Sequence, residues 1–317
     1  MNHRFVALSG GVGGAKLALG LAKTLPAERL TIIANTGDDF VHMGLHIAPD
    51  LDTLMYTLAA VSNTETGWGR GAESWNFMSA TAELGGETWF NLGDKDLATH
   101  IQRTRRLKNG ETLSEVTSAL SRALGIAHSI APMSNDPVRT IVTTADGDLA
   151  FQHYFVRERC TPVITGVRFE GADRARPAPG FVKALDDPAL SAVIICPSNP
   201  LLSIDPILAL PGIRQTLTDL AAPVIAVSPI VKGMAIKGPA AKMMAELGME
   251  ASVVAVARHY RGLVDGLVID RQDENSRAAV ERLGMEVLVT NTIMETLDDR
   301  IELAKICLAF SGRIGTA

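Results

Sequence analysis

The feature that most constrains this fold is an alternation of short apolar runs with stretches of helical spacing. Residues 5–8 are apolar and precede a glycine-rich turn, residues 15–25 carry apolar side chains at helical spacing, and residues 30–34 are apolar again. The last third of the chain repeats the pattern, with apolar runs at 192–196, 223–227, 267–270 and 286–289. Strands that alternate with helices predict a parallel sheet covered by helices.

The middle of the chain is more helical. Helices are expected at 54–61, 73–84, 97–107 and 113–124, and Thr112 and Glu115 have the spacing of a capping box at the start of the last one. Two runs at 140–144 and 150–156 flank Ala-Asp-Gly-Asp and predict a β-hairpin. We therefore expect a doubly wound, mostly parallel, Rossmann-like α/β core formed by residues 1–48 and 185–317. Residues 49–184 would be a mostly helical insertion that carries the hairpin.

Composition excludes several classes of protein. With 317 residues, 47% of them hydrophobic, the chain can bury a full core and is not a disordered protein. Its 30 basic and 35 acidic residues give a net charge of −5, which argues against a nucleic-acid partner. No apolar stretch approaches the roughly 18 residues of a membrane-spanning helix, so no membrane association is expected.

The cysteines and the N-terminal sequence point to a compartment. Cys160, Cys196 and Cys307 lie far apart without a CxxC pair, which predicts neither a zinc site nor a disulfide framework and fits a reducing cytosol. The first residues lack the pattern of a signal peptide. A cytoplasmic location is therefore expected.

The turn after the first predicted strand is rich in glycine. Gly10, Gly11, Gly13 and Gly14 precede Lys16. The GxGxxG pattern would need a glycine in place of Lys16, and a Walker A loop would need glycine before this lysine and Ser or Thr after it. Glycines let a backbone approach a phosphate, and the following helix offers N–H groups. We predict a phosphate-binding or nucleotide-binding loop of neither common type; the alternative is a tight strand-to-helix turn.

Acidic residues follow in two further loops. Asn35 stands where a nicotinamide-binding domain has an acid, which disfavours a dehydrogenase. Asp38 and Asp39 come shortly after it, and Asp50 and Asp52 are one residue apart in a Pro-Asp-Leu-Asp-Thr segment. On extended backbone these last two would point the same way, and Mg²⁺ takes one or two carboxylates together with substrate phosphates. We predict a Mg²⁺ site at Asp50 and Asp52, joined by Asp39 or Asp38; the alternative is that these acids cap a helix.

Other candidates come from the remaining loops. Lys95 falls in the first turn of a predicted helix, where its charge opposes the helix dipole, and this favours a ligand for its ammonium. Trp68, between two glycines, is a candidate for stacking on a flat ligand. Polar and basic side chains in the later loops could bind a base or a phosphate: Ser198, Asn199, Ser228, Lys232 and Lys237. Asn35, Thr36 and Asp94 are further candidates for contacts with a substrate.

The ordered motifs SGGVGGAK, NTGDD, PDLDTLMYTL, GWGRG, LGDKDLATHI, PSNP and SPIVKGMAIKGPA resemble, nearly end to end, the CofD family of 2-phospho-L-lactate transferases, whose bacterial members are often called FbiA. The resemblance implies Mg²⁺-dependent transfer of a phosphorylated three-carbon acid from a GDP-linked donor to the ribityl hydroxyl of the deazaflavin FO. GMP would leave, and a coenzyme F-420 precursor would form. The resemblance also implies that FO contacts Asp50 or Asp52 and Lys95, where archaeal members often carry Arg, and that the protein is a homodimer.

This chemistry agrees with the residues. Phosphoryl transfer depends on positioning and charge neutralisation more than on covalent catalysis. Asp50 and Asp52 would hold the metal or orient the attacking hydroxyl, and Lys95 would balance the developing charge. Phosphoenolpyruvyl is the first expected donor group, because the glycine loop has a bacterial form, followed by 2-phospho-L-lactyl and 3-phosphoglyceryl. The alternative from another class is a regulatory protein that binds a nucleotide sugar without chemistry.

Overall fold

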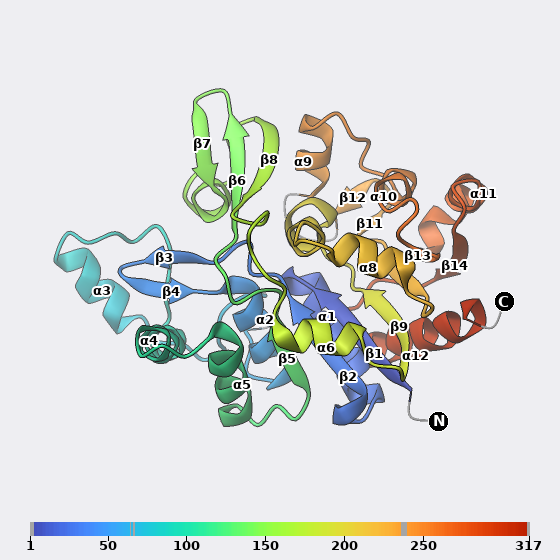
Figure 1. Cartoon of the computed structure of the whole chain (residues 1–317). Coiled ribbons are helices and arrows are strands. Elements are labelled where there is room, and N and C mark those ends of the chain that lie inside the picture. The colour runs from blue at the N-terminus through green and yellow to red at the C-terminus, as the bar shows by residue number, and fades with distance from the viewer. Residues whose placement is uncertain (1–2, 64, 66, 236–239, 316–317) are drawn as a thin grey trace.

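The computed structural model describes residues 3–63, 65, 67–235 and 240–315. A seven-stranded sheet runs through the molecule in the order β14-β13-β10-β9-β1-β2-β5, and every pairing in it is parallel (Figure 1). The predicted α/β fold is confirmed. The strands are β1 (Arg4–Ser9), β2 (Leu30–Ala34), β5 (Ser129–Pro132), β9 (Leu190–Ile195), β10 (Val224–Val227), β13 (Gly266–Asp270) and β14 (Glu286–Thr290).

Helices cover both faces of this sheet, which explains why its strands are continuous apolar runs. On β1, Phe5 and Ala7 belong to one hydrophobic cluster, and Val6 and Leu8 belong to another. The first cluster includes side chains of α1 (Gly11–Thr24), α2 (Pro49–Leu58), α5 (Leu113–Ala123) and α12 (Leu297–Ile314). The second includes side chains of α6 (Pro179–Leu185), α7 (Asp205–Leu208), α8 (Ile213–Asp219), α10 (Val253–His259) and α11 (Arg277–Glu281).

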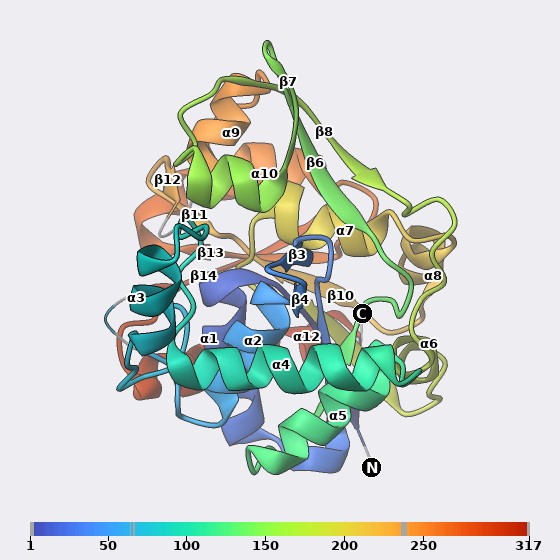
Figure 2. The same cartoon turned by 90° about the vertical axis from the view of Figure 1, so that its left-hand side faces the viewer.

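Residues 49–184 are mostly helical, but they are not separate from the sheet. Besides α2 and α5 they form α3 (Asn76–Glu83) and α4 (Asp94–Lys108), and the predicted capping box of Thr112 and Glu115 opens α5. Figure 2 shows α4 crossing in front of α2. The strand β5, which the sequence reading missed, pairs with β2 at the edge of the sheet. The proposed division of the chain into a core and an insertion stays a prediction. The strand β5 belongs to the predicted insertion by sequence but pairs with a strand of the predicted core.

The predicted hairpin is present and belongs to a larger unit. β6 (Arg139–Thr144) pairs antiparallel with β7 (Gly147–Ala150) and, on its other side, with β8 (Ile164–Glu170). The second strand ends earlier than expected, because residues 153–157 form a π-helical turn, η2 (His153–Arg157). This three-stranded sheet stands above a second hairpin, β3 (Phe40–His42) and β4 (Leu45–Ile47) (Figure 1).

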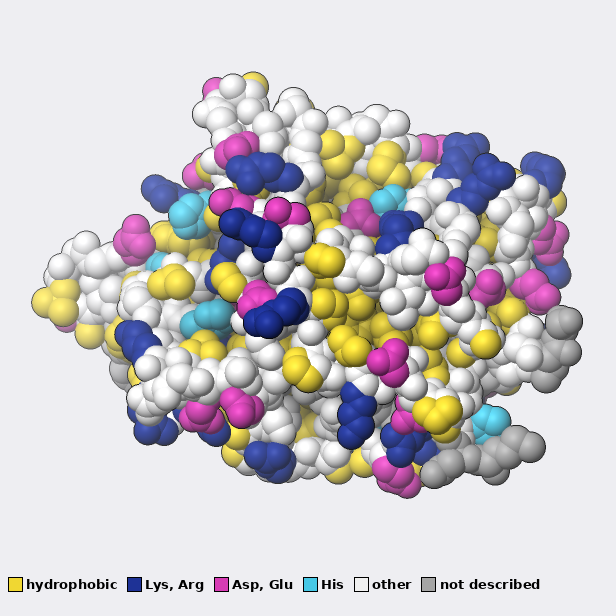
Figure 3. Space-filling model, viewed as in Figure 1, with side chains coloured by type: hydrophobic (Ala, Val, Ile, Leu, Met, Phe, Trp, Pro, Cys, Tyr) yellow, Lys and Arg dark blue, Asp and Glu magenta, His cyan; other side chains and the backbone are white. Residues whose placement is uncertain are grey.

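The remaining described elements are short. They are the helical turns η1 (Ala27–Arg29), η3 (Pro200–Ile204) and η4 (Arg271–Ser276), the hairpin of β11 (Ile230–Val231) and β12 (Met234–Ala235), and α9 (Ala240–Glu246). Within the described residues, no helix is both long enough and apolar enough to cross a membrane. On the face shown in Figure 3, basic and acidic side chains are interspersed.

Candidate active site

The glycine turn fits tightly against the loop that follows β9. The Gly10 amide donates to Ser198 Oγ at 3.1 Å. A Cβ built on Gly13 would lie 2.4 Å from the carbonyl oxygen of Pro197, and one on Gly14 would lie 2.5 Å from Ser198 Oγ. Since β1 and β9 are neighbours, their carboxyl ends bring the two loops together. A Cβ on Gly10 would likewise lie 2.5 Å from Ser203 Cβ, so close packing accounts for three of the glycines. The contact between the two loops places the start of α1 at the carboxyl edge of the sheet.

Asp50 joins this turn to the loop that follows β2. Its Oδ1 accepts a hydrogen bond from the Gly11 amide at 2.7 Å, and its Oδ2 accepts one from Asn35 Nδ2 at 2.9 Å. Gly11 has φ +64°, a conformation that suits glycine. The predicted convergence of Gly11, Asn35 and Asp50 is therefore observed.

Asp38, Asp39 and Asp50 are all buried, and we call them the Asp50 cluster. Burial raises the pKa of Asp38 well above its usual range, and the charges of Asp50 and Asp39 raise it further. Burial likewise raises the pKa of Asp50 to about 6 and raises that of Asp39, although His46 opposes the latter shift. Among the described residues, Oδ1 of Asp38 and Oδ1 of Asp39 have no hydrogen-bond partner. Buried carboxylates with spare oxygens are suitable ligands for Mg²⁺.

Asp52 lies in a different environment, and the expectation that it points the same way as Asp50 is wrong. Both residues belong to the first turn of α2 rather than to extended backbone. Two residues along a helix correspond to a rotation of about 200°, so the side chains leave in nearly opposite directions. The Asp52 carboxylate accepts from both terminal nitrogens of Arg103 on α4, and one of these bonds measures 3.0 Å.

Around this ion pair lies a second buried group, Asp52, Asp96, His100 and Arg103, which we call the Asp52 cluster. Tyr56 donates to Asp96 Oδ1 at 2.6 Å, and His100 Nε2 lies 3.4 Å from the same oxygen. Burial alone would lower the pKa of Arg103, but the Asp52 carboxylate raises it. Ligand atoms of Asp52, Asp96 and His100 lie within 4.8 Å of one another. The guanidinium already pairs with Asp52, and the metal role predicted for Asp52 stays a prediction.

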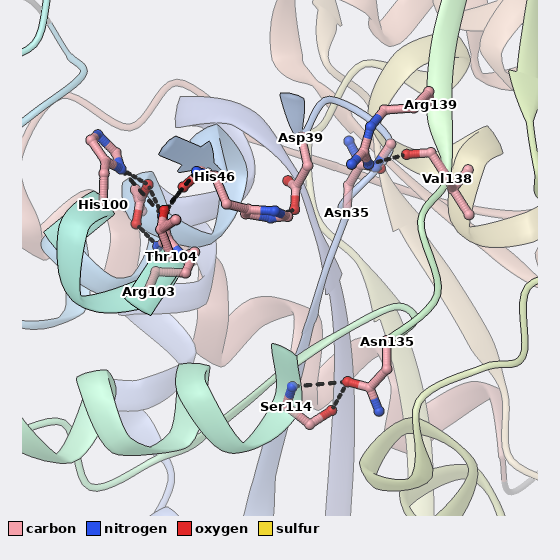
Figure 4. A network of polar contacts seen from close by, with 12 residues as sticks. Asn35, Asp39, His46, His100, Arg103, Thr104, Ser114, Asn135, Val138 and Arg139 are labelled. Carbon is pink, nitrogen blue, oxygen red and sulfur yellow. Dashed lines mark hydrogen bonds and ion pairs between the residues drawn. The ribbon is translucent and has the colours of Figure 1, made fainter. Parts of the chain in front are cut away.

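His46 on β4 lies between the two clusters. Its Nε2 lies 3.0 Å from Asp39 Oδ2, and its carbonyl oxygen accepts from Arg103 at 3.4 Å. Its amide donates to Thr104 Oγ1 at 2.7 Å. Figure 4 shows the imidazole pointing from β4 toward Asp39, with Arg103 and His100 behind it on α4. The sequence reading did not select this histidine, because its contacts lie on other elements.

Two acidic side chains, Asp94 and Glu73, join the start of α4 to the segment that leads into α3. Asp94 accepts from Ser74, from the Phe77 amide and from Asn76, and these bonds lower its pKa to about 2. It therefore caps α3 rather than facing the Asp50 cluster. Glu73 in turn accepts from the amides of Lys95 and Asp96 at 2.8 Å each. Glu73 was not predicted, since a cap supplied from 22 residues away leaves no local signal.

Lys95 is exposed, and its ammonium donates to the carbonyl oxygen of Ala72 at 2.5 Å. Beside this loop, Trp68 is 47% exposed and lines a hollow of about 20 Å³ together with Arg70, Glu73 and Asp96. Among the described residues, Trp68 therefore has an exposed position beside a small hollow.

Several other predicted side chains make local contacts. Lys16 Nζ donates to the Met294 carbonyl at 2.6 Å, in the loop after β14. Asn199 Oδ1 accepts from the Leu201 amide at 3.0 Å and caps η3. Ser228 Oγ bonds both the amide and the carbonyl of Ile230. These contacts stabilise the loops at the sheet edge.

Two further predicted residues differ in burial. Lys232 is exposed at the two-residue turn of the β11–β12 hairpin, where both it and Gly233 have positive φ. Thr36 is buried, and its hydroxyl has no hydrogen-bond partner among the described residues. Lys237 lies outside the described residues.

The fold and the site together define a class. A parallel sheet that gathers a glycine turn, hydroxyl groups and buried carboxylates at its carboxyl edge is typical of α/β proteins that bind phosphorylated ligands there. A model of the family described as 2-phospho-L-lactate transferase CofD matches residues 5–300. The chain belongs to this family and is therefore a transferase, as the sequence motifs predicted.

Relatives carry two different names. A phosphoenolpyruvate transferase of Kitasatospora aureofaciens is 40% identical over 318 residues, which cover 98% of each chain. A 2-phospho-L-lactate transferase of Methanocaldococcus jannaschii is 40% identical over 311 residues, which cover 97% of this chain and 98% of the relative. A solved structure of a UPF0052-family protein from Bacillus halodurans is similar in fold, with a TM-score of 0.63 and 15% identity over 97% of this chain and 99% of that one.

Proposed function

We propose that this chain transfers a phosphorylated three-carbon acid from a GDP-linked donor to the ribityl hydroxyl of the deazaflavin FO, as a step in the synthesis of coenzyme F-420. The hydroxyl oxygen forms a bond to the phosphorus nearer the acid, the bond from that phosphorus to the bridging oxygen breaks, and GMP leaves. The hydroxyl proton is lost to a base or to water. The observation that carries this proposal is the meeting of the glycine turn, Ser198 and Asp50 at one edge of the sheet.

The first turn of α1 provides the donor site in this proposal. Amides in the first turn of a helix have no partner within the helix, and the helix dipole favours negative charge there. Asp50 occupies the Gly11 amide, which leaves the amides that follow for a diphosphate. Ser198 holds the turn in place from the neighbouring strand end.

The Asp50 cluster fits a magnesium ion. Asp50, with a second carboxylate from Asp39 or Asp38, would hold it, since Mg²⁺ takes one or two carboxylates and completes its shell with water and phosphate oxygens. When bound, the ion would neutralise the diphosphate and the departing GMP. Burial is the main cause of the raised pKa values of these acids, and the positive charge of a bound ion would favour their ionised form. Asp52 acts in this proposal as a positioning residue, because it anchors α4 through Arg103.

Lys95 would balance negative charge that develops during transfer. Lys95 lies in the first turn of α4, and its amide donates to Glu73. This contact fixes the backbone from which the exposed side chain extends. Exchange of its contact with Ala72 for a contact with the ligand would bring the charge to the substrate.

The three-carbon group of the donor needs a direct test. Relatives with either name reach 40% identity, so overall similarity does not rank the donors. Phosphoenolpyruvyl remains the first expectation, on the bacterial form of the glycine loop. Mass spectrometry of the product formed with each of the three donors distinguishes them. We also propose a homodimer in the cytoplasm, and light scattering that returns the monomer mass of 33.7 kDa would contradict the dimer.

The test of the whole proposal is release of GMP. The purified chain is incubated with FO, magnesium and each GDP-linked donor in turn, and nucleotides are separated by chromatography. GMP and a phosphodiester of FO are expected with at least one donor. Absence of GMP with all three donors would refute the transferase reaction and favour the regulatory protein that binds a nucleotide sugar.

A further inference from the structure

A cavity of about 220 Å³ opens beside the Asp50 cluster, between the loop that follows β2 and the β6–β7–β8 sheet. A hydrogen bond of 2.7 Å from the Thr140 amide to the Gly37 carbonyl joins the two sides. A single water needs only about 10–15 Å³ of such space, so the cavity has room for a group of several heavy atoms. Its lining residues are Gly37, Asp38, Asp39, Phe40, Arg139, Thr140, Ile141, Ala150, Phe151, Gln152 and Glu170.

Arg139 carries the only guanidinium or ammonium group among the described lining residues. One of its terminal nitrogens donates to the Val138 carbonyl at 2.8 Å, and within the described part of the chain the guanidinium forms no ion pair. Its charge opposes the rise in the pKa of Asp39, because the two side chains lie near each other. Figure 4 shows Arg139 beside Asn35 and Asp39 at the end of β2. A guanidinium has five N–H groups, so most of those of Arg139 remain for a ligand.

Gln152 is a second polar residue of the lining. It stands at the start of η2 and is only 5% exposed, and its side-chain amide has no hydrogen-bond partner among the described residues. Native proteins leave few buried polar groups without a partner. Independently of Arg139, this amide therefore indicates a ligand that forms hydrogen bonds.

The other charged residues of the lining are acids with interactions of their own. Asp38 and Asp39 belong to the Asp50 cluster, whose negative charge a metal ion would balance in the proposed function. Glu170 stands opposite Arg139 on β8, but its carboxylate lies 3.4 Å from Arg168. With the ion bound, Arg139 is therefore left to attract an anionic group.

The chemistry of these side chains selects a carboxylate. A planar guanidinium matches a carboxylate with two parallel hydrogen bonds, and an amide N–H adds a further donor. The three possible donors of the proposed function all carry a carboxylate on the three-carbon group, whereas the reacting side chain of the acceptor carries hydroxyls. Ile141 and Phe151 add apolar walls, which suit the methyl or methylene carbon next to that carboxylate.

We propose that Arg139 and Gln152 bind the carboxylate of the donor's three-carbon acid. The inference rests on the proposed function and adds to it the residues that recognise the acid. Asp38 and Asp39 line the same cavity, so a three-carbon group bound there lies next to the acids that would hold the metal. The lining of this cavity thus selects a donor that bears a carboxylate over one that lacks it.

The test measures binding of the donor with magnesium and without FO, by titration calorimetry. Of the three GDP-linked donors, the one that the unmodified protein binds most tightly is compared with the ethyl ester of GDP. In this ester a hydrogen replaces the carboxylate of the lactyl donor, and the diphosphate is unchanged. Binding of the acid is thereby separated from binding of the nucleotide and from turnover.

Arg139→Met removes the charge and keeps the length of the side chain. We expect the Kd for the carboxylate donor to rise about 10–100-fold and the Kd for the ethyl ester to stay within about twofold. Arg139→Lys keeps the charge without the fork and should give a smaller rise, as should Gln152→Leu, about 3–10-fold each. Arg157→Met is the matched control, because Arg157 belongs to η2 but lies outside the cavity, and neither Kd should change.

The outcomes separate this inference from the proposed function. An unchanged Kd for the carboxylate donor in Arg139→Met would overturn the carboxylate site, even where the unmodified protein releases GMP. Equal rises for the donor and the ethyl ester would also overturn it, since Arg139 would then act on the nucleotide or on the fold. A rise for the carboxylate donor alone supports the site, including where no GMP is released, which would refute only the transfer reaction. If the unmodified protein binds none of the three donors, both proposals are wrong.

Discussion

The two acidic clusters on either side of α2 are buried alike and differ in electrostatics. Asp52 faces Arg103 and His100, so its charge is compensated. Asp50 accepts hydrogen bonds from the Gly11 amide and from Asn35, and it lies near Asp38 and Asp39. Three carboxyl groups therefore gather there, and among the described residues none of them forms an ion pair with Lys or Arg. Buried charge without compensation is retained mainly where it serves a ligand. The comparison agrees with a structural role for the Asp52 cluster and with the metal-binding role that we propose for the Asp50 cluster.

The largest expected effect comes from breaking the compensated cluster. Asp52→Ala leaves the Arg103 guanidinium buried without its partner, and we expect a loss of about 3–5 kcal/mol in the free energy of unfolding, measured by urea denaturation. Replacing Arg103 by Met in the same chain removes the isolated charge and should restore most of the stability. If the free energy of unfolding of Asp52→Ala stays within about 1 kcal/mol of that of the unmodified protein, the ion pair does not support the fold.

Removing the charge of the other cluster should act on catalysis instead. Asp50→Asn deletes a metal-binding carboxylate of the proposed site, and we expect GMP release to fall by about 10²–10³-fold. The fold should persist, because no buried cation loses its partner, and circular dichroism checks this. Turnover close to that of the unmodified protein would remove Asp50 from the proposed reaction.

The pH dependence of stability sharpens the same comparison. In the folded chain the pKa of Asp50 is about 6, above the ordinary value of 3.8. The folded state therefore binds more protons than the unfolded state between these values, so the contribution of Asp50 to stability falls as pH rises from about 4 to about 6. Two pKa units correspond to about 3 kcal/mol.

This contribution is measured as the difference in unfolding free energy between the unmodified protein and Asp50→Asn, in chelator, at several pH values. As pH rises, the unfolding free energy of the unmodified protein should fall relative to that of Asp50→Asn. A difference that is constant from pH 4 to pH 7 would show that Asp50 titrates normally in the fold.

The smallest expected effect concerns the cap of α4. Glu73→Gln weakens the bonds to the amides of Lys95 and Asp96, and we expect a loss of about 1 kcal/mol in the free energy of unfolding. In the proposed function the variant should also raise the KM for FO, since the backbone at Lys95 loses the contact that positions it. Glu83→Gln, on the exposed end of α3, is the control and should change neither quantity. Equal stability of both variants would argue against the cap.

Sequence reasoning located the loops of the site more reliably than the directions of their side chains. It brought Gly11, Asn35 and Asp50 to one place, because strand ends of a parallel sheet share an edge. It placed Asp52 beside Asp50, because it read the segment as extended backbone. It missed Glu73, because its partners lie 22 and 23 residues away in the chain.

The order of apolar runs and glycine-rich turns by itself determined the parallel sheet, since periodicity and turn chemistry are local properties of the chain. The family followed from the resemblance of the ordered motifs, which are also written in the sequence. Only the tertiary structure decided which acids meet a cation. Arg103 reaches Asp52 across 51 positions, and the rotation of α2 turns Asp50 away from it. Charge compensation depends on distance in space, and no local pattern records that distance.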